Sequence, residues 1–171
     1  MTLDHLSFGT HNLAATRHFY EGQLGFPVTI HEQLLMAEGG RVEHIFFDCG
    51  GDCALAFMQW IAVPGVADTY DTGINRGLGV PRGTFHFAFR CASQEALMQR
   101  RCDLQSRGVV VGRILDLDPY CSFFFDDPVN GLRLEYTTRC RSLKPEDRDP
   151  SRRIIPVSLA TFEQAAVPIN D

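Results

Sequence analysis

The sequence predicts an α+β protein built from two copies of one module, each with a strand, a helix and three further strands. The order of strand-like and helix-like segments in residues 1–61 starts again at residue 84, after a connection rich in Gly and Pro. His5 and His86 take the same place in the two copies, 81 residues apart. Gly25 and Gly108, which end the two predicted helices, are 83 residues apart. This nearly constant spacing indicates an internal duplication.

The first copy begins with apolar and polar residues that alternate over residues 3–8, a pattern typical of a strand. A helix follows, with Asn12 as its predicted N-cap, apolar residues at helical spacing, and Gly25 at its end. Three strands are then expected over residues 26–35, 42–48 and 53–60, with glycine-containing turns between them.

The second copy repeats this order after a long connection, residues 64–83, in which we expect no further element. A strand over residues 84–91 precedes a helix that Ser93 caps and Gly108 ends. Three more strands are predicted over residues 109–115, 120–125 and 132–137. The predicted divisions are a first module (1–61), a linker (62–83), a second module (84–138) and a C-terminal extension (139–171).

The composition is that of a soluble globular protein: 171 residues, 44% hydrophobic, 22% charged, with a net charge of −5. An acidic chain without a basic face is not expected to bind nucleic acid. No apolar run is long enough to span a membrane and no signal peptide is evident, so a cytoplasmic location is expected. The six cysteines are scattered, which predicts free, buried thiols rather than disulfides. Basic residues and prolines after residue 138 indicate an extended arm on the surface or on a partner, with disorder as the alternative.

Three possible metal ligands fall on predicted strands. Alternate side chains of a strand face opposite sides, so His5, His86 and Glu135 lie opposite the apolar faces that would pack on the helices. Two histidines and one carboxylate are the ligand set of mononuclear non-haem iron(II) sites, and manganese, zinc or nickel also accept it. The alternative is that each is an ordinary half-buried strand residue.

Two groups of motifs carry a resemblance to a known family. Asn-Leu at 12–13, Phe-Tyr-Glu at 19–21 and Leu-Gly-Phe at 24–26 resemble the first-module signature of the vicinal oxygen chelate superfamily. The run Asp-Pro-Val-Asn-Gly-Leu-Arg-Leu-Glu at 127–135 resembles its closing signature. This superfamily includes glyoxalase I, extradiol dioxygenases, fosfomycin-modifying transferases and bleomycin resistance proteins.

The resemblance implies paired βαβββ modules that form one curved, open, mixed sheet around a divalent metal bound by the two histidines and the glutamate. Glyoxalase-like members carry a fourth ligand on the last strand of the first module. Here that position falls on Leu55 or Ala56, neither of which binds a metal, and Gln59 could replace it only with a register shift. A three-ligand site is the pattern of the extradiol dioxygenases and the fosfomycin-modifying enzymes.

The dioxygenase interpretation also lacks two expected residues. Extradiol enzymes of this family resemble one another in a tyrosine on the strand before the ligating glutamate and a histidine upstream of it. The tyrosine position falls here on Phe124 or Phe125, and the sequence has no histidine between His86 and Glu135. We therefore consider Tyr120 or His44 as the proton donor or base.

Two further residues are assigned to the substrate pocket. Arg82, at the end of the linker, would hold an anionic group of the substrate, with a surface salt bridge as the alternative. Phe124 belongs to a run of three phenylalanines, of which two are expected in the core and one in the pocket wall.

The leading hypothesis is a divalent-metal enzyme closest to the extradiol dioxygenases, with iron(II) as the favoured metal and a small catechol-like substrate that offers two adjacent oxygens. A glyoxalase-like lyase or isomerase using the same metal site is one alternative. A non-catalytic, drug-binding protein is the other. The resemblance also implies a homodimer.

Overall fold

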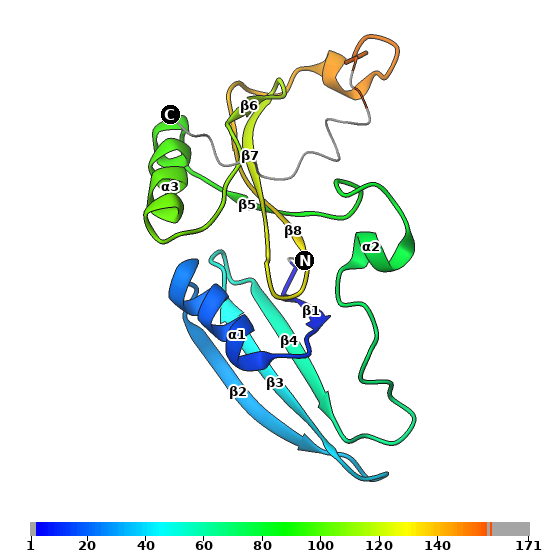
Figure 1. Ribbon diagram of the computed structural model, residues 1–171. Helices are drawn as coiled ribbons and strands as arrows, with labels where there is room; N and C mark the ends of the chain where they lie inside the picture. Colours follow the sequence, from blue (N-terminus) through cyan, green and yellow to red (C-terminus); the bar gives the residue numbers. More distant parts are fainter. Residues whose placement is uncertain (1–2, 157, 159–171) are drawn as a thin grey trace. The chain divides into compact units, whose positions relative to one another are not determined.

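The computed structural model describes residues 3–156 and 158 of the chain. These residues form two compact units, the first made of residues up to 77 together with 127–132, the second of residues 78–126 together with those from 133 on. Each unit contains one open, four-stranded, mixed sheet (Figure 1). The predicted α+β class with two strand–helix–three-strand modules is confirmed.

The first unit follows the predicted order of elements. Its sheet has the strand order β1-β4-β3-β2, in which β1 runs parallel to β4 and the other neighbours are antiparallel. Its elements are β1 (His5–Gly9), α1 (Leu13–Arg17), the π-helical turn η1 (His18–Gln23), β2 (Val28–Leu35), β3 (Arg41–Asp48), β4 (Ala54–Ile61) and α2 (Ile74–Leu78). The prediction that residues 64–83 contain no further element is wrong, because the short helix α2 forms there after Gly73.

The first helix is capped as the sequence predicts. The side chain of Asn12 accepts a hydrogen bond from the amide of Ala15 at 2.9 Å. The chain leaves the helical region at Gly25, whose φ of 72° is a conformation that favours glycine. Between these ends, Tyr20 is fully buried and packs on Phe47 and Phe57, with ring centroids 5.5 and 4.7 Å away. The helical segment therefore covers one face of the sheet (Figure 1).

A buried carboxylate joins the helical segment to the turn at residues 127–132. Asp127 is 1% exposed, and its Oδ2 accepts hydrogen bonds from the Tyr20 hydroxyl at 3.0 Å and from Asn130 Nδ2 at 2.8 Å. Its Oδ1 accepts from the amides of Val129 and Asn130. Burial raises the pKa of Asp127 above its ordinary value, and these donors oppose that rise. The carboxylate is thus buried with both oxygens satisfied.

We expect Tyr20→Phe to lower the free energy of unfolding by about 1–3 kcal/mol at neutral pH, because it leaves a buried carboxylate oxygen without one donor. Protonation of Asp127, whose folded pKa is raised, stabilises the fold at low pH, and this contribution is lost as pH rises through that pKa. The penalty of Tyr20→Phe should therefore shrink towards acid pH. Urea unfolding at several pH values measures both effects. Tyr120→Phe, on a partly exposed ring, is the matched control and should stay within about 0.5 kcal/mol of the wild type.

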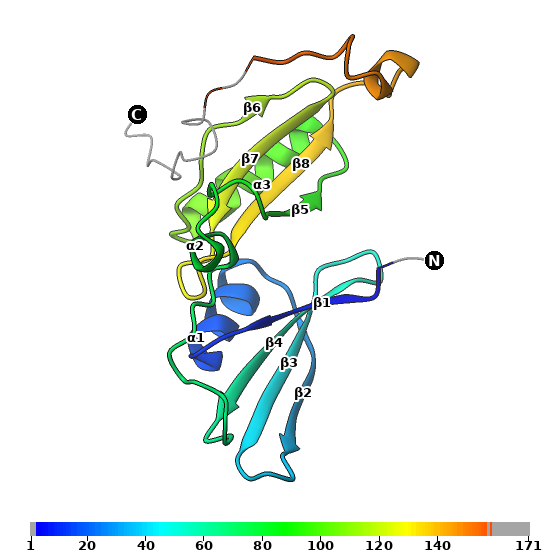
Figure 2. The same cartoon turned by 90° about the vertical axis from the view of Figure 1, so that its right-hand side faces the viewer.

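The second unit repeats the architecture with a smaller sheet. The strand order is β5-β8-β7-β6, with β5 parallel to β8. Its elements are β5 (Phe87–Arg90), α3 (Gln94–Ser106), β6 (Leu115–Asp116), β7 (Tyr120–Asp126), β8 (Arg133–Arg139) and the 3₁₀ turn η2 (Pro145–Arg148). Figure 2 shows α3 lying across one face of this sheet. Ser93 caps α3 by accepting from the amide of Ala96, and Gly108 ends it with a φ of 79°.

The strand predicted over residues 109–115 is largely wrong. Only β6, at its end, belongs to the sheet, apart from a single bridge between Val111 and Phe125. Val109 and Val111 are buried while Val110 is half exposed. The run of β-branched valines is typical of a strand, and its burial alternates as in a strand, but no continuous ladder of hydrogen bonds forms.

The prediction of free thiols is wrong for two of the six cysteines. Cys121, on β7, and Cys140, just after β8, form a disulfide with a Cα–Cα distance of 6.1 Å. The antiparallel register pairs Cys121 with Thr138, which brings Cys140 to the same end of the strand pair. Sequence could not reveal this pair, since the cysteines are 19 residues apart and the second lies in the expected extension. The other four cysteines are free, and Cys102 is exposed rather than buried.

The first part of the C-terminal extension folds onto the second unit. Arg141 forms ion pairs with Asp118 and Asp147, and Arg153 reaches the same two carboxylates. The prediction of an extended surface arm therefore holds only in part, because η2 and these ion pairs organise residues 141–153. Residues 157 and 159–171 lie outside the described residues. In the part of the chain that the structure describes, no helix is long and apolar enough to cross a membrane.

Candidate metal and substrate site

Two of the three predicted metal ligands meet in the second unit. The parallel register pairs Ala88 of β5 with Glu135 of β8, and His86 lies two residues before Ala88. His86 Nε2 and Glu135 Oε2 are 3.2 Å apart. Glu135 is only 7% exposed, so its carboxylate is held at low dielectric beside the imidazole. A proton or a cation between His86 and Glu135 would compensate the charge of the carboxylate, because a buried carboxylate without a positive partner is costly.

The imidazole of His86 has a fixed orientation. Its Nδ1 donates a hydrogen bond to the carbonyl oxygen of Gly83 at 2.9 Å, because a carbonyl can only accept. Nε2 therefore faces Glu135. The hydrogen bond with Glu135 is the main cause that raises the pKa of His86, partly offset by burial. A divalent cation can replace the proton on Nε2, and an acceptor on the other ring nitrogen is the usual support of a metal-binding histidine.

The third predicted ligand, His5, has the same arrangement in the first unit. Its Nδ1 lies 2.6 Å from Asp4 Oδ1, which directs Nε2 away from that carboxylate. The His5 ring meets the edge of Phe46 with a centroid distance of 5.4 Å. The side chain is 44% exposed. His5 therefore also presents Nε2 as a ligand atom, with its other nitrogen held by an oxygen.

The strand registers identify the equivalent of Glu135 in the first unit. Ser7, two residues after His5, pairs with Ala56 on β4. In the second unit the residue two positions after His86 pairs with Glu135. Ala56 thus holds the place of the glutamate, whereas Leu55 points to the opposite face. Of the two positions that the sequence left open for a fourth ligand, the register selects Ala56, which has no donor atom.

Both polar atoms of the Gln59 side chain form hydrogen bonds with the backbone at the start of α1. Its Oε1 accepts from the amide of Leu13 at 2.8 Å, and its Nε2 donates to the carbonyl of His11 at 3.1 Å. These bonds hold the start of α1 against β4. Gln59 is therefore a structural residue of the helix-covered face, and not a spare metal ligand.

The two candidates for proton transfer differ in their surroundings. His44 lies on β3, on the same face as Phe46, with ring centroids 4.3 Å apart. Its Nδ1 is 3.2 Å from Glu32 Oε1, and its buried Nε2 has no hydrogen-bond partner within the described residues. Tyr120 begins β7 and pairs with Arg139. It lies four residues from Phe124, which pairs with Glu135, or about 13 Å along the strand. The structure does not bring Tyr120 to the glutamate.

The predicted pocket residues lie beside the His86–Glu135 pair. The ring of Phe124 meets that of His86 edge-on with a centroid distance of 5.9 Å. The guanidinium of Arg133 lies over the Phe124 ring, 5.1 Å from the ring centroid. Arg133 and Arg82 both form ion pairs with Asp126. Arg82 is thus already part of a charged cluster. The sequence indicated Arg133 only as one of several arginines that could hold an anionic group, and it did not indicate Asp126, although both face the same side as Glu135.

The expectation for the phenylalanine run is consistent with this arrangement. Phe123 and Phe125 are fully buried on the helix-covered face, and Phe124 is partly exposed on the other face. The strand's alternation therefore sends two rings to the core and one towards the candidate site.

A depression of about 360 Å³ lies on the first unit next to His5. Asp4 and Phe46, the two residues that contact His5, line it together with residues from β2 and from the turn between β3 and β4. Asp48 and Asp52 add two carboxylates to its rim. The depression is thus partly aromatic and acidic, and it is lined by two neighbours of His5 rather than by His5 itself.

These features define a protein with two βαβββ modules and candidate metal ligands on the faces that the helices leave uncovered. The chain belongs to the Glyoxalase/Bleomycin resistance protein/Dioxygenase superfamily, whose family model matches residues 2–136. No curated protein matches the sequence.

Several solved structures share the fold at low sequence identity. An antibiotic binding protein, TnmS3, from Streptomyces sp. CB03234 is 18% identical, with a TM-score of 0.54, over 81% of this chain and 96% of its own. A glyoxalase/bleomycin resistance protein/dioxygenase from Nocardioides is 21% identical, with a TM-score of 0.55, over 85% and 87%. A domain of the same description from Frankia sp. EAN1pec is 15% identical, with a TM-score of 0.59, over 81% and 98%.

Proposed function

We propose that the protein is a metal-dependent enzyme in which His5, His86 and Glu135 bind one divalent ion, with iron(II) favoured and manganese, zinc or nickel as alternatives. The observation that carries this proposal is the buried Glu135 carboxylate 3.2 Å from the oriented Nε2 of His86. The matching arrangement at His5, with Nδ1 held by Asp4, supports the third ligand.

The proposed reaction is of the extradiol dioxygenase type, on a small catechol-like substrate with two adjacent oxygens. A divalent ion with three protein ligands supplies Lewis acidity and leaves positions for substrate oxygens and for dioxygen. Ala56 supports this reaction over glyoxalase-like chemistry, because it adds no fourth protein ligand. Phe124 and Phe46 would shield the substrate from water beside their histidines.

Among this chain's own residues, His44 is proposed as the base that takes a proton from a substrate hydroxyl. Its Nε2 is free of hydrogen bonds to the described residues, and Glu32 beside Nδ1 would stabilise the imidazolium that forms. Tyr120 is the second candidate, and its distance along β7 from the Glu135 row favours His44.

Metal content is the first test. Protein purified anaerobically without chelators should contain about one iron per chain, and Glu135→Ala or His86→Ala should lower this content about tenfold, since each removes a ligand. His31→Ala, on an exposed histidine of β2, is the matched control and should keep the metal. Elemental analysis gives the measurement. Absence of metal from the wild type, or full metal content in both ligand variants, contradicts the proposed site.

Oxygen uptake with a panel of catechols tests the reaction. With equal iron content, His44→Ala should lower kcat by about 100-fold or more, the usual scale for loss of a positioned base. Tyr120→Phe should retain wild-type turnover. Equal loss in Tyr120→Phe would move the proton-transfer role to that residue, and full activity in His44→Ala would exclude His44 from the reaction.

A non-catalytic, antibiotic-binding function is the second candidate. The fold similarity to an antibiotic binding protein and the open depression beside His5 favour it. Metal content separates the two candidates, because a binder of this kind would not need the ligand trio. Zinc, nickel or manganese in place of iron would instead favour a lyase or isomerase at the same site. A homodimer is proposed for either function, and light scattering measures the mass.

A further inference from the structure

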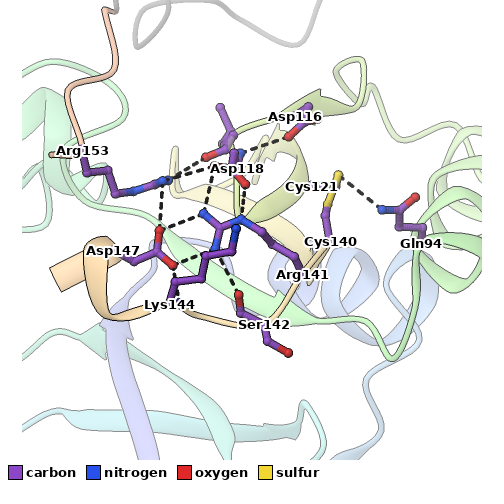
Figure 3. Close-up of polar contacts among 11 residues, drawn as sticks. Gln94, Asp116, Asp118, Cys121, Cys140, Arg141, Ser142, Lys144, Asp147 and Arg153 are labelled. Carbon is purple, nitrogen blue, oxygen red and sulfur yellow. Dashed lines mark hydrogen bonds and ion pairs between the residues drawn. A yellow bond between two sulfur atoms is a disulfide. The ribbon is translucent and has the colours of Figure 1, made fainter.

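A second group of metal-ligating side chains lies at the far end of β8, away from the candidate site. This cluster consists of Asp116 on β6 and the disulfide-bonded pair of Cys121, on β7, and Cys140, after β8 (Figure 3). One oxygen and two sulfur atoms of the cluster all lie within 4.8 Å of one another. Cys140 follows Glu135 by five residues, or about 16 Å along the strand. The cluster is therefore separate from the proposed iron site.

Each member of the cluster is held in place by its neighbours. The carboxylate of Asp116 accepts a hydrogen bond from the amide of Asp118 at 3.0 Å. The amide of Cys140 donates to the carbonyl of Pro119 at 2.8 Å, which fixes the chain after β8 to the turn before β7. Gln94, the first residue of α3, points its Nε2 at Cys121 Sγ, 3.9 Å away (Figure 3). The sulfur atoms and the carboxylate thus converge from three different strands or strand ends.

We propose that the reduced form of this cluster is a binding site for a soft divalent cation of the zinc class. A thiol or phosphine reductant supplies two electrons that break the S–S bond, and two protons from solvent complete the two thiols. The reductant leaves as its own disulfide or as the phosphine oxide. Each thiol releases its proton to solvent when the ion binds, so the ion meets two thiolates and one carboxylate. Thiolate ligands select zinc over magnesium or calcium, and one position stays open for water.

The geometry suits this change of state. Zinc–sulfur distances near 2.3 Å in a tetrahedral site place two sulfurs about 3.8 Å apart. The three ligand atoms already lie within 4.8 Å of one another, a span on the scale of this sulfur–sulfur separation. The amide hydrogen of Gln94 would stabilise the thiolate of Cys121. The disulfide and the metal site use the same sulfur atoms, so one state excludes the other.

Cobalt(II) titration of the full-length protein tests this site. After reduction with a phosphine and removal of metals by a chelator, Co²⁺ should produce a thiolate-to-cobalt charge-transfer band that saturates at one ion per chain. Zn²⁺ should abolish the band by competition. The oxidised protein should show no band until the phosphine is added. The titration is done in Glu135→Gln protein as well, where the band should be unchanged because the proposed iron site does not contain sulfur.

Variants decide which residues produce the band. The double variant Cys121→Ser/Cys140→Ser should lose it, and Asp116→Asn should weaken Co²⁺ binding by about tenfold or more. Cys49→Ser/Cys53→Ser and Cys102→Ser are matched controls on free cysteines and should retain it. A band that persists in Cys121→Ser/Cys140→Ser, or no band in the reduced wild type, overturns the site. Unchanged affinity in Asp116→Asn overturns the assignment of the carboxylate. Circular dichroism of each variant checks that it is folded.

Discussion

The hydrogen bonds around the Asp127 carboxylate are the constraint on which the first unit depends. An unsatisfied carboxylate at 1% exposure would cost more than such a small domain can tolerate, so Tyr20, Asn130 and two turn amides must stay in place together. Asn130 also reaches Thr16, which links to Thr10 after β1. The sequence motifs at 19–21 and 127–131 therefore contribute to one buried polar cluster. This cluster stabilises the fold, and it lies away from the sheet faces that the helices leave uncovered.

The internal duplication places two equivalent positions on the two sheets, and the chain uses them differently. In each unit a histidine at the start of the first strand (His5 of β1) or directly before it (His86, before β5) has its Nδ1 held by an oxygen. The residue two positions after each histidine pairs with one residue of the neighbouring parallel strand. In the second unit that residue is Glu135, and in the first it is Ala56. The two units thus differ at this position, since Glu135 offers a carboxylate and Ala56 offers no donor atom.

Much of this architecture could be predicted from the sequence, because strand alternation and helix caps are local. The period of two correctly placed Phe124 on the face of Glu135, and Asn12, Ser93 and the two helix-ending glycines fixed the helix ends. Non-local pairings could not be predicted. The disulfide depends on how far β8 extends, and the ion pair of Arg82 depends on Asp126 at the end of β7. The segment before β6 is rich in valine, yet β6 has only two residues.

The start of the C-terminal extension belongs to the folded second unit, although it lies beyond the residues that the family model matches. The family model stops at residue 136, whereas β8 runs to Arg139 and the Arg141 guanidinium bridges Asp118 and Asp147 beyond it. A chain cut at the homologous boundary would lose the last three residues of a buried strand's ladder and every cation that neutralises this turn. The segment after the family match is thus part of the scaffold it follows, and a recombinant fragment has to reach at least Arg153 to keep these contacts.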